Sequence, residues 1–252
     1  MILSFEHGEV RELRMNRPPV NALTSESLSD LRYAVARAAT EGARAVVLSG
    51  LPGRFSAGLD VPLLLTLDEA GISKLWKELY ATLEAMARSP IPIVAAVTGH
   101  APAGGTVLAL FCDWRVMAQG DFKIGLNEVL VGIPLPPVIL GGLQRLVGVR
   151  RAEYLAVSGA LISPDEALAE GLVDEVVSSD ELIPRALQWC NRLLSVPREA
   201  MRLTRQQARG DLEQLFASGM DAELRTVIAN WWSPETQETL KGLVERLKKK
   251  AG

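Results

Sequence analysis

Two adjacent glycines, Gly104 and Gly105, lie where an apolar stretch typical of a strand gives way to one typical of a helix. Glycine lets the backbone approach a ligand closely, and the first N–H groups of a helix have no partner inside the helix. The helix dipole also favours negative charge at this place. One interpretation is a site where backbone N–H groups bind a negatively charged ligand, although an isolated glycine pair does not by itself favour it. The alternative is that the glycines only allow a helix to pack closely on a strand.

A second loop rich in small residues strengthens the first interpretation. Residues 43–49 form an apolar run, and glycine, alanine and serine are frequent in the loop that follows, residues 50–60. In parallel sheets covered by helices, ligands bind at the loops that leave the carboxyl ends of the strands. Both loops hold that position, so the sequence predicts a binding site between them.

One carboxylate, Glu128, stands out because its neighbours Leu126, Val129, Leu130 and Val131 are all apolar. Such an acid is either a surface residue at the start of a turn or a buried group with a raised pKa. The local sequence by itself favours the surface position.

The composition excludes several other classes of site. With two histidines, His7 and His100, a His-rich zinc site is excluded, and the two cysteines, Cys112 and Cys190, have the apolar or amphipathic surroundings of free thiols. The net charge of −3 disfavours a nucleic-acid binder. The N-terminus resembles neither a signal nor a transit peptide, and no apolar run is long enough to span a membrane. We therefore expect a cytoplasmic protein that binds neither nucleic acid nor membrane.

Strands and helices alternate around the two loops. The periodicity predicts a hairpin over residues 2–15, a helix from Thr24 or Ser25 to about residue 40, and a helix over residues 67–87. Buried strands are expected at residues 43–49 and 93–97, and the alternation favours parallel strands with covering helices. Further helices are expected at residues 139–147, 150–158, 164–170 and 179–194, a last strand at 173–177, and helices only from Arg198 onwards.

Six short motifs, taken in order, resemble the crotonase superfamily, also called the enoyl-CoA hydratase/isomerase family. They are Asn16-Arg17-Pro18 with Asn21-Ala22-Leu23, Phe55-Ser56-Ala57-Gly58-Leu59-Asp60, Gly99 with Ala103-Gly104-Gly105, Cys112-Asp113, Asn127-Glu128 with Gly132-Ile133, and Leu161, Ala167 with Gly171-Leu172-Val173-Asp174. The resemblance extends over nearly the whole chain.

The resemblance implies an α/β fold in which a spiral of ββα units packs two sheets against helices. Residues 1–195 would form this core with an acyl-CoA site, and residues 196–252 would be a helical region that covers the site and mediates trimerisation. A homotrimer or a dimer of trimers is expected. The ligand would be an acyl-CoA thioester, and no separate cofactor or metal is expected, because coenzyme A is part of the substrate.

The resemblance also implies roles for residues. The thioester oxygen would accept hydrogen bonds from the N–H groups of Leu59 and Gly104, each such donor typically contributing about 3–4 kcal/mol. Substrate contacts are implied at Val20, Ala22, Ala57, Asp60, Gly105, Val107 and Asn127. Hydratases of this family use two glutamates, and Val107 stands at the first of these positions while Glu128 stands at the second.

A single base suffices to move a proton between two carbons, and this pattern is similar to that of the Δ3,Δ2-enoyl-CoA isomerases. We expect Glu128 to transfer a proton from C2 to C4 of a 3-enoyl-CoA. The alternatives are hydration or thioester hydrolysis with Glu128 as the base, or a catalytically silent acyl-CoA-binding subunit.

Overall fold

A computed structural model describes residues 2–251. Met1, at the start of the predicted core (residues 1–195), and Gly252, at the end of the predicted helical region (residues 196–252), lie outside the described residues. The strands are β1 Ile2–His7, β2 Val10–Met15, β3 Ala45–Ser49, β4 Gly53–Arg54, β5 Ile93–Val97, β6 Gly99–Pro102, β7 Trp114–Ala118, β8 Ile124–Gly125 and β9 Glu175–Val177. The helices are α1 Ser25–Thr40, α2 Val61–Leu64, α3 Glu69–Ala87, α4 Gly104–Leu110, the 3₁₀ helix η1 Glu128–Val131, α5 Pro137–Val147, α6 Val149–Ser158, α7 Pro164–Ala169, α8 Leu182–Leu194, α9 Arg198–Ala208, α10 Gly210–Gln214, α11 Asp221–Trp231 and α12 Pro234–Ala251.

Two sheets form the centre of the molecule. The larger sheet has the order β1-β2-β3-β5-β7-β9, in which only the β1–β2 hairpin is antiparallel. The smaller sheet has the order β4-β6-β8 with parallel pairing. The predicted α/β crotonase-like fold, with two sheets, covering helices and a helical C-terminal region, is confirmed.

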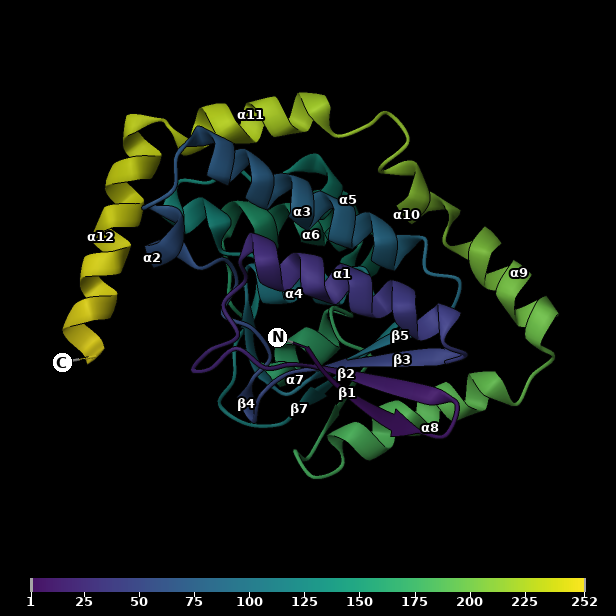
Figure 1. The fold of residues 1–252 in the computed structure, drawn as a ribbon. Coiled ribbons are helices and arrows are strands. Elements are labelled where there is room, and N and C mark those ends of the chain that lie inside the picture. The colour runs from purple at the N-terminus through teal and green to yellow at the C-terminus, as the bar shows by residue number, and fades with distance from the viewer. Residues whose placement is uncertain (1, 252) are drawn as a thin grey trace.

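The central strands are buried on both faces, which explains their uninterrupted apolar sequences. Successive side chains of a strand point to opposite faces. Accordingly Val46 and Leu48 of β3 belong to the large core under α1 and α3, while Ala45 and Val47 belong to a smaller core under α8. Figure 1 shows α1 and α3 on one side of the sheet and α8 on the other.

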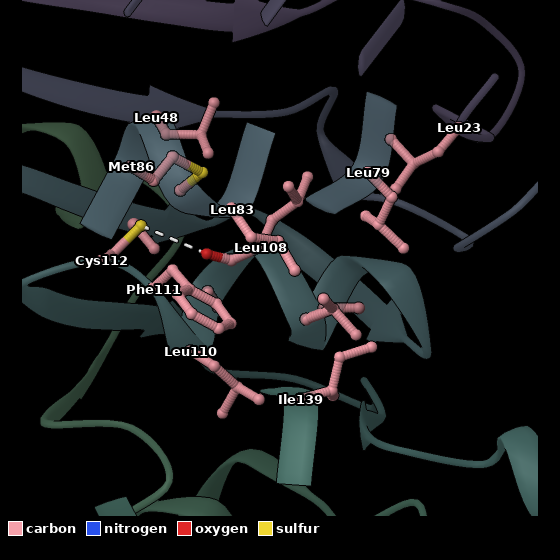
Figure 2. Close-up of a cluster of buried hydrophobic side chains, with 14 of the residues drawn as sticks. Leu23, Leu48, Leu79, Leu83, Met86, Leu108, Leu110, Phe111, Cys112 and Ile139 are labelled. Carbon is pink, nitrogen blue, oxygen red and sulfur yellow. Dashed lines mark hydrogen bonds between the residues drawn. The ribbon is translucent and has the colours of Figure 1, made fainter. Parts of the chain in front are cut away.

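The large core continues from the sheet into the helices. Figure 2 shows side chains from three elements packed together. They are Leu48 of β3, Leu83 and Met86 of α3, Leu108 of α4 and Phe111, the residue that follows α4. All five side chains are fully buried. Because every residue of α4 is buried and its last four belong to this core, the position of its N-terminus is fixed by packing.

Most predicted elements are confirmed to within a few residues, and local signals explain why. Thr24 caps α1 through a capping box with Ser27, and Ser163 caps α7 in the same way with Glu166. Cys112 and Cys190 are free buried thiols, as predicted, and burial raises the pKa of each to about 12.

Several short elements are absent from the sequence prediction. The strands β4 and β6 contain two and four residues, which is too short to show periodicity, whereas β8 is the short strand expected within residues 121–133. Strand β7 begins with Trp114 and Arg115 and therefore does not read as an apolar strand. Helix α5 begins at Pro137, earlier than predicted, because proline is well suited to the first helical position.

The helices after Arg198 run round the outside of the molecule, from α9 beside the sheet over α3 to α12 at the C-terminus (Figure 1). Helix α11 contacts α3, and α12 contacts α2 and η1. The hydroxyl of Thr236 on α12 donates a 2.6 Å hydrogen bond to the carbonyl of Gly132, at the end of η1. Within the described part of the chain, no helix is both long and apolar enough to cross a membrane.

Candidate active site

Two loops far apart in sequence run side by side next to α4. Leu23 and Leu59 form a parallel bridge, in which the Leu23 N–H donates to the Gly58 carbonyl at 2.7 Å and the Asp60 N–H donates to the Leu23 carbonyl at 2.9 Å. The Ala57 N–H donates to the Val20 carbonyl at 2.9 Å. The loop at residues 20–24 therefore pairs side by side with the loop at residues 56–60, in the manner of two short parallel strands.

Gly58 and Gly104 bring the second loop against the start of α4. A Cβ atom on Gly58, whose φ is +81°, would lie 3.0 Å from the Gly104 nitrogen. A Cβ atom on Gly105 would lie 2.6 Å from the Ser56 carbonyl oxygen. The glycines are thus required for close packing, and this packing places the Leu59 and Gly104 N–H groups on adjacent segments. The two interpretations of the glycine pair are therefore compatible.

The Leu59 and Gly104 N–H groups donate no hydrogen bond to another group within residues 2–251. Ala103, immediately before α4, has φ +48° and ψ −120°, a conformation that costs a non-glycine residue energy. Such strain is typical of functional sites, where the surrounding structure holds it in place. The geometry provides two unpartnered backbone donors that can bind an oxygen carrying negative charge.

Glu128 approaches this region through the smaller sheet. Strand β8 pairs with β6, which leads directly into α4, and the Ala103 N–H donates to the Gly125 carbonyl at 2.8 Å. Glu128 opens η1 three residues after β8, and the next residues, Val129 and Leu130, are exposed.

The carboxylate of Glu128 points inward. Glu128 as a whole is half-buried, but its Oε2 atom is buried and has no hydrogen-bond partner in the described part of the chain. Burial raises the pKa of Glu128 to about 7, and no neighbouring charged group contributes to this shift. The surface position that the local sequence favours is therefore wrong for this carboxylate. A solitary carboxylate with a pKa near neutrality is well suited to accept and return a proton.

The structure gives Asp60 partners inside the protein. Its Oδ2 forms a 2.7 Å ion pair with Arg17, and its Oδ1 accepts a hydrogen bond from the Leu63 N–H at the start of α2. The carboxylate thus caps its own helix, and any ligand contact at this residue would have to share it with Arg17. Pro62 lies in the first turn of α2.

The remaining predicted residues divide into surface and core positions. Val20, Ala22 and Asn127 are half-buried and Ala57 is exposed, so these residues are accessible to a ligand. Gly105 and Val107 are buried in the packing of α4. His100 accepts a hydrogen bond from the Lys123 N–H and contacts the Phe122 ring edge-to-face, which supports a structural role.

Sequence analysis missed the positioning role of Asn21. Its φ is +51°, its Nδ2 donates to the Met15 and Phe55 carbonyls at 3.1 Å each, and its Oδ1 accepts from the Arg17 N–H at 2.7 Å. The Ser56 hydroxyl donates to the Asn21 carbonyl at 2.7 Å. The available signal was an asparagine after two prolines, because asparagine tolerates the left-handed conformation.

Thr106 is a second missed positioning residue, since it joins α4 to the strand that leads to Glu128. Its hydroxyl donates to the Ala101 carbonyl at 2.5 Å and accepts from the Gly125 N–H at 2.8 Å. The side chain is fully buried. It therefore holds the segment with the free N–H groups and the segment with the carboxylate in a fixed relation.

Replacing Thr106 with valine is expected to lower both stability and catalytic rate. The Gly125 N–H would remain buried without a partner, which costs about 1–3 kcal/mol. Small misplacements of reacting groups lower rates strongly, so kcat should fall about tenfold or more. Thr82→Val is the matched control, because Thr82 is an equally buried hydroxyl that joins α1 and α3 through the Leu28 carbonyl. Thermal unfolding should show a loss in both variants, and an equal loss of kcat in both would contradict the positioning role.

Comparison with known proteins shows that the chain is similar to enoyl-CoA isomerases and hydratases. A family model described as enoyl-CoA hydratase/isomerase matches residues 6–251. The chain is 33% identical to the mouse protein "Enoyl-CoA delta isomerase 1, mitochondrial", over 96% of the chain and 85% of that protein. It is 36% identical to "Probable enoyl-CoA hydratase echA17" of Mycolicibacterium paratuberculosis, over 86% of the chain and 84% of that protein.

The fold agrees with the same group of proteins. The crystal structure of human mitochondrial delta3-delta2-enoyl-CoA isomerase superimposes with a TM-score of 0.94 at 31% identity, and the match covers 100% of this chain and 99% of that one. The similarity therefore includes the helices after Arg198 as well as the sheets.

Proposed function

The chain belongs to the enoyl-CoA hydratase/isomerase family, and from this premise we propose that it is an isomerase that converts 3-enoyl-CoA thioesters to 2-trans-enoyl-CoA thioesters. The observation that carries the proposal is the solitary buried carboxylate of Glu128, whose pKa is shifted by burial without a contribution from a second acid. Val107, at the position where hydratases have their other glutamate, is a fully buried apolar side chain of α4. A valine can neither bind a water molecule nor transfer a proton.

The proposed reaction moves one proton between two carbons. The Glu128 carboxylate removes a proton from C2, and the electron pair of that C–H bond delocalises onto the thioester oxygen to give a dienolate. The Leu59 and Gly104 N–H groups donate hydrogen bonds to this oxygen and stabilise its negative charge. The protonated Glu128 then returns the same proton to C4, the double bond shifts to C2–C3, and the carboxylate is regenerated.

The accessible surface beside the site supports a proposed position for the substrate. The coenzyme A part would lie along Val20, Ala22 and Ala57, which line the two adjacent loops and are accessible. Helix α12 contacts η1 and would cover the acyl part of the substrate. The proposal also includes assembly into trimers through the C-terminal helices. The apolar side chain of Val107 would keep water away from C3.

The test is an assay with short-chain and long-chain 3-enoyl-CoA thioesters, in which formation of the conjugated product is followed by its ultraviolet absorbance. We expect steady formation of 2-enoyl-CoA without a further loss of the conjugated double bond. Hydration is the second candidate, because the similar mycobacterial proteins are named as hydratases. Rapid addition of water to 2-enoyl-CoA by the purified protein would replace the isomerase proposal with that one.

A further inference from the structure

A cavity of about 280 Å³ lies at the other end of β5 from the candidate active site. It is formed by the end of α3, the segment before β5, and helices α9 and α10. The candidate active site follows the carboxyl end of β5, whereas this cavity lies near the start of that strand. Four arginines and one carboxylate line it, namely Arg88, Arg202, Arg205, Arg209 and Glu213.

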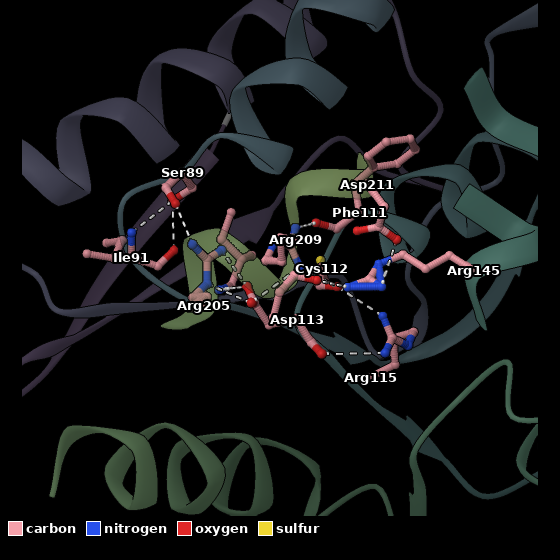
Figure 3. A network of polar contacts seen from close by, with 12 residues as sticks. Ser89, Ile91, Phe111, Cys112, Asp113, Arg115, Arg145, Arg205, Arg209 and Asp211 are labelled. Atoms are coloured by element: carbon pink, nitrogen blue, oxygen red, sulfur yellow. Dashed lines mark hydrogen bonds and ion pairs between the residues drawn. The ribbon is translucent and has the colours of Figure 1, made fainter. Parts of the chain in front are cut away.

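The inner wall of the cavity has more buried positive than negative charge. Arg205 binds Asp113 through two contacts of 2.7 and 2.8 Å, and Arg209 reaches the same carboxylate at 3.3 Å (Figure 3). The three side chains are between 7% and 11% exposed. Two largely buried guanidinium groups thus share a single carboxylate. The nearby Arg115 forms its own ion pair with Asp174.

The remaining contacts of Arg205 and Arg209 do not supply the missing negative charge. Arg205 donates to the Ser89 carbonyl at 2.6 Å, and Arg209 donates to the Phe111 carbonyl at 2.8 Å. Burial, together with the nearby positive charge of Arg205, lowers the pKa of Arg209 although Asp113 opposes this effect. The buried cluster therefore has one unit of positive charge that its own groups do not neutralise.

The outer wall carries two further arginines, and two of their three carboxylate partners are exposed while Glu213 is half-buried. Arg88 pairs with Glu84 and Glu213, and Arg202 pairs with Glu199. Glu199 is 69% and Glu84 is 42% exposed, and such surface pairs contribute only about 0–1 kcal/mol each. Arg202 can therefore turn toward an anion in the cavity at little cost, and Arg88 can leave Glu84 at little cost but also pairs with the half-buried Glu213.

We propose that this cavity binds a small phosphate-type anion, held by Arg88 and Arg202 at the outer wall and by the excess charge of Arg205 and Arg209 within. The planar guanidinium group matches the oxygen geometry of phosphate with paired hydrogen bonds. A volume just below the range of about 300–1,000 Å³ for typical ligand pockets suits free phosphate or a small phosphate monoester rather than coenzyme A. The bound anion would connect α9 and α10 to α3, and so fasten the start of the helical segment that continues over the candidate active site.

The test is isothermal titration calorimetry of the full-length protein with inorganic phosphate, at an ionic strength held constant with sodium chloride. Saturating coenzyme A is present throughout, so that phosphate binding at a coenzyme A site is not counted. We expect one saturable site per chain. Glycerol 3-phosphate in a parallel titration distinguishes a monoester from free phosphate as the preferred source of the anion.

The double variant Arg88→Gln/Arg202→Gln should bind phosphate at least tenfold more weakly. Both side chains are more than one-third exposed, so the variant is expected to fold, which its circular dichroism and melting temperature would verify. Arg37→Gln is the matched control, because Arg37 is an exposed, ion-paired arginine on α1 outside the cavity. Absence of saturable binding in the wild type, or equal affinity in the wild type and the double variant, would overturn the proposal. Neither result would bear on the isomerase assay.

Discussion

Glu128→Gln is expected to lower kcat for the isomerisation of 3-enoyl-CoA by about 10⁴-fold, the upper end of the range for loss of general acid–base catalysis. Glutamine has nearly the shape of glutamate but cannot accept a proton at any accessible pH. KM should change little, because in the proposed reaction the carboxylate acts on a C–H bond rather than on the coenzyme A part. Stopped or continuous absorbance assays with a single 3-enoyl-CoA would measure both constants.

The control for this variant is Glu223→Gln. Glu223 on α11 also has a buried Oε2 atom without a hydrogen-bond partner among residues 2–251 and a pKa raised by burial, but its helix packs against α3 and belongs to neither loop of the site. Its replacement should leave kcat close to that of the wild type. A similar loss in both variants would indicate a general effect of removing a buried carboxylate and would remove the support for Glu128 as the base.

The pH dependence gives a second readout of the same residue. Glu128 acts as a base only when ionised, so kcat/KM should rise with pH and level off above its pKa of about 7, and the residual activity of Glu128→Gln should lack this rise. The stability of the folded protein should change with pH in the opposite direction to kcat/KM. Because the pKa in the folded state is above the ordinary 4.5, the folded protein binds the extra proton between these values and loses stability as pH rises through them, by at most about 3 kcal/mol. The glutamine variant should not show this decline.

Gly58→Ala is expected to lower kcat by about 10²–10³-fold, the loss found when one donor of an oxyanion hole is removed. The new Cβ atom would lie 3.0 Å from the Gly104 nitrogen and 3.0 Å from the Ala103 Cβ atom, so the loop must move away from α4. This movement separates the Leu59 and Gly104 N–H groups and disturbs both donors. The measurement is kcat for 3-enoyl-CoA, with the melting temperature recorded in parallel.

Gly148→Ala separates this effect from backbone strain. Gly148 has φ +77°, close to the +81° of Gly58, but a Cβ atom there meets no other atom within 4 Å. Both variants place an alanine at a positive φ and should lose stability for that reason, and only Gly58→Ala should lose activity. If Gly58→Ala kept full activity, the two N–H groups would not form the proposed oxyanion site.

The sequence by itself determined the elements whose signals are local. A capping residue and a 3.6-residue apolar stripe, as at Thr24 and Leu28 to Val35 of α1, are complete within a few turns and do not depend on distant contacts. Runs such as Ile93–Val97 show a strand buried on both faces for the same reason. The motifs likewise pointed to the family, because each is a short stretch whose backbone conformation needs particular residues, such as the glycines at 58 and 104.

Only the tertiary structure decided how the site is assembled. The exposure of the Glu128 carboxylate depends on elements that pack around η1 from distant parts of the chain, including α6 and α12, so the local sequence favoured the wrong side. The partners of Asp60 and the role of Thr106 come from Arg17 and Gly125, which lie 43 and 19 residues away. Hydrogen bonds and burial depend on distance in space, and a pattern along the chain contains that information only where the contacting residues are also neighbours in sequence.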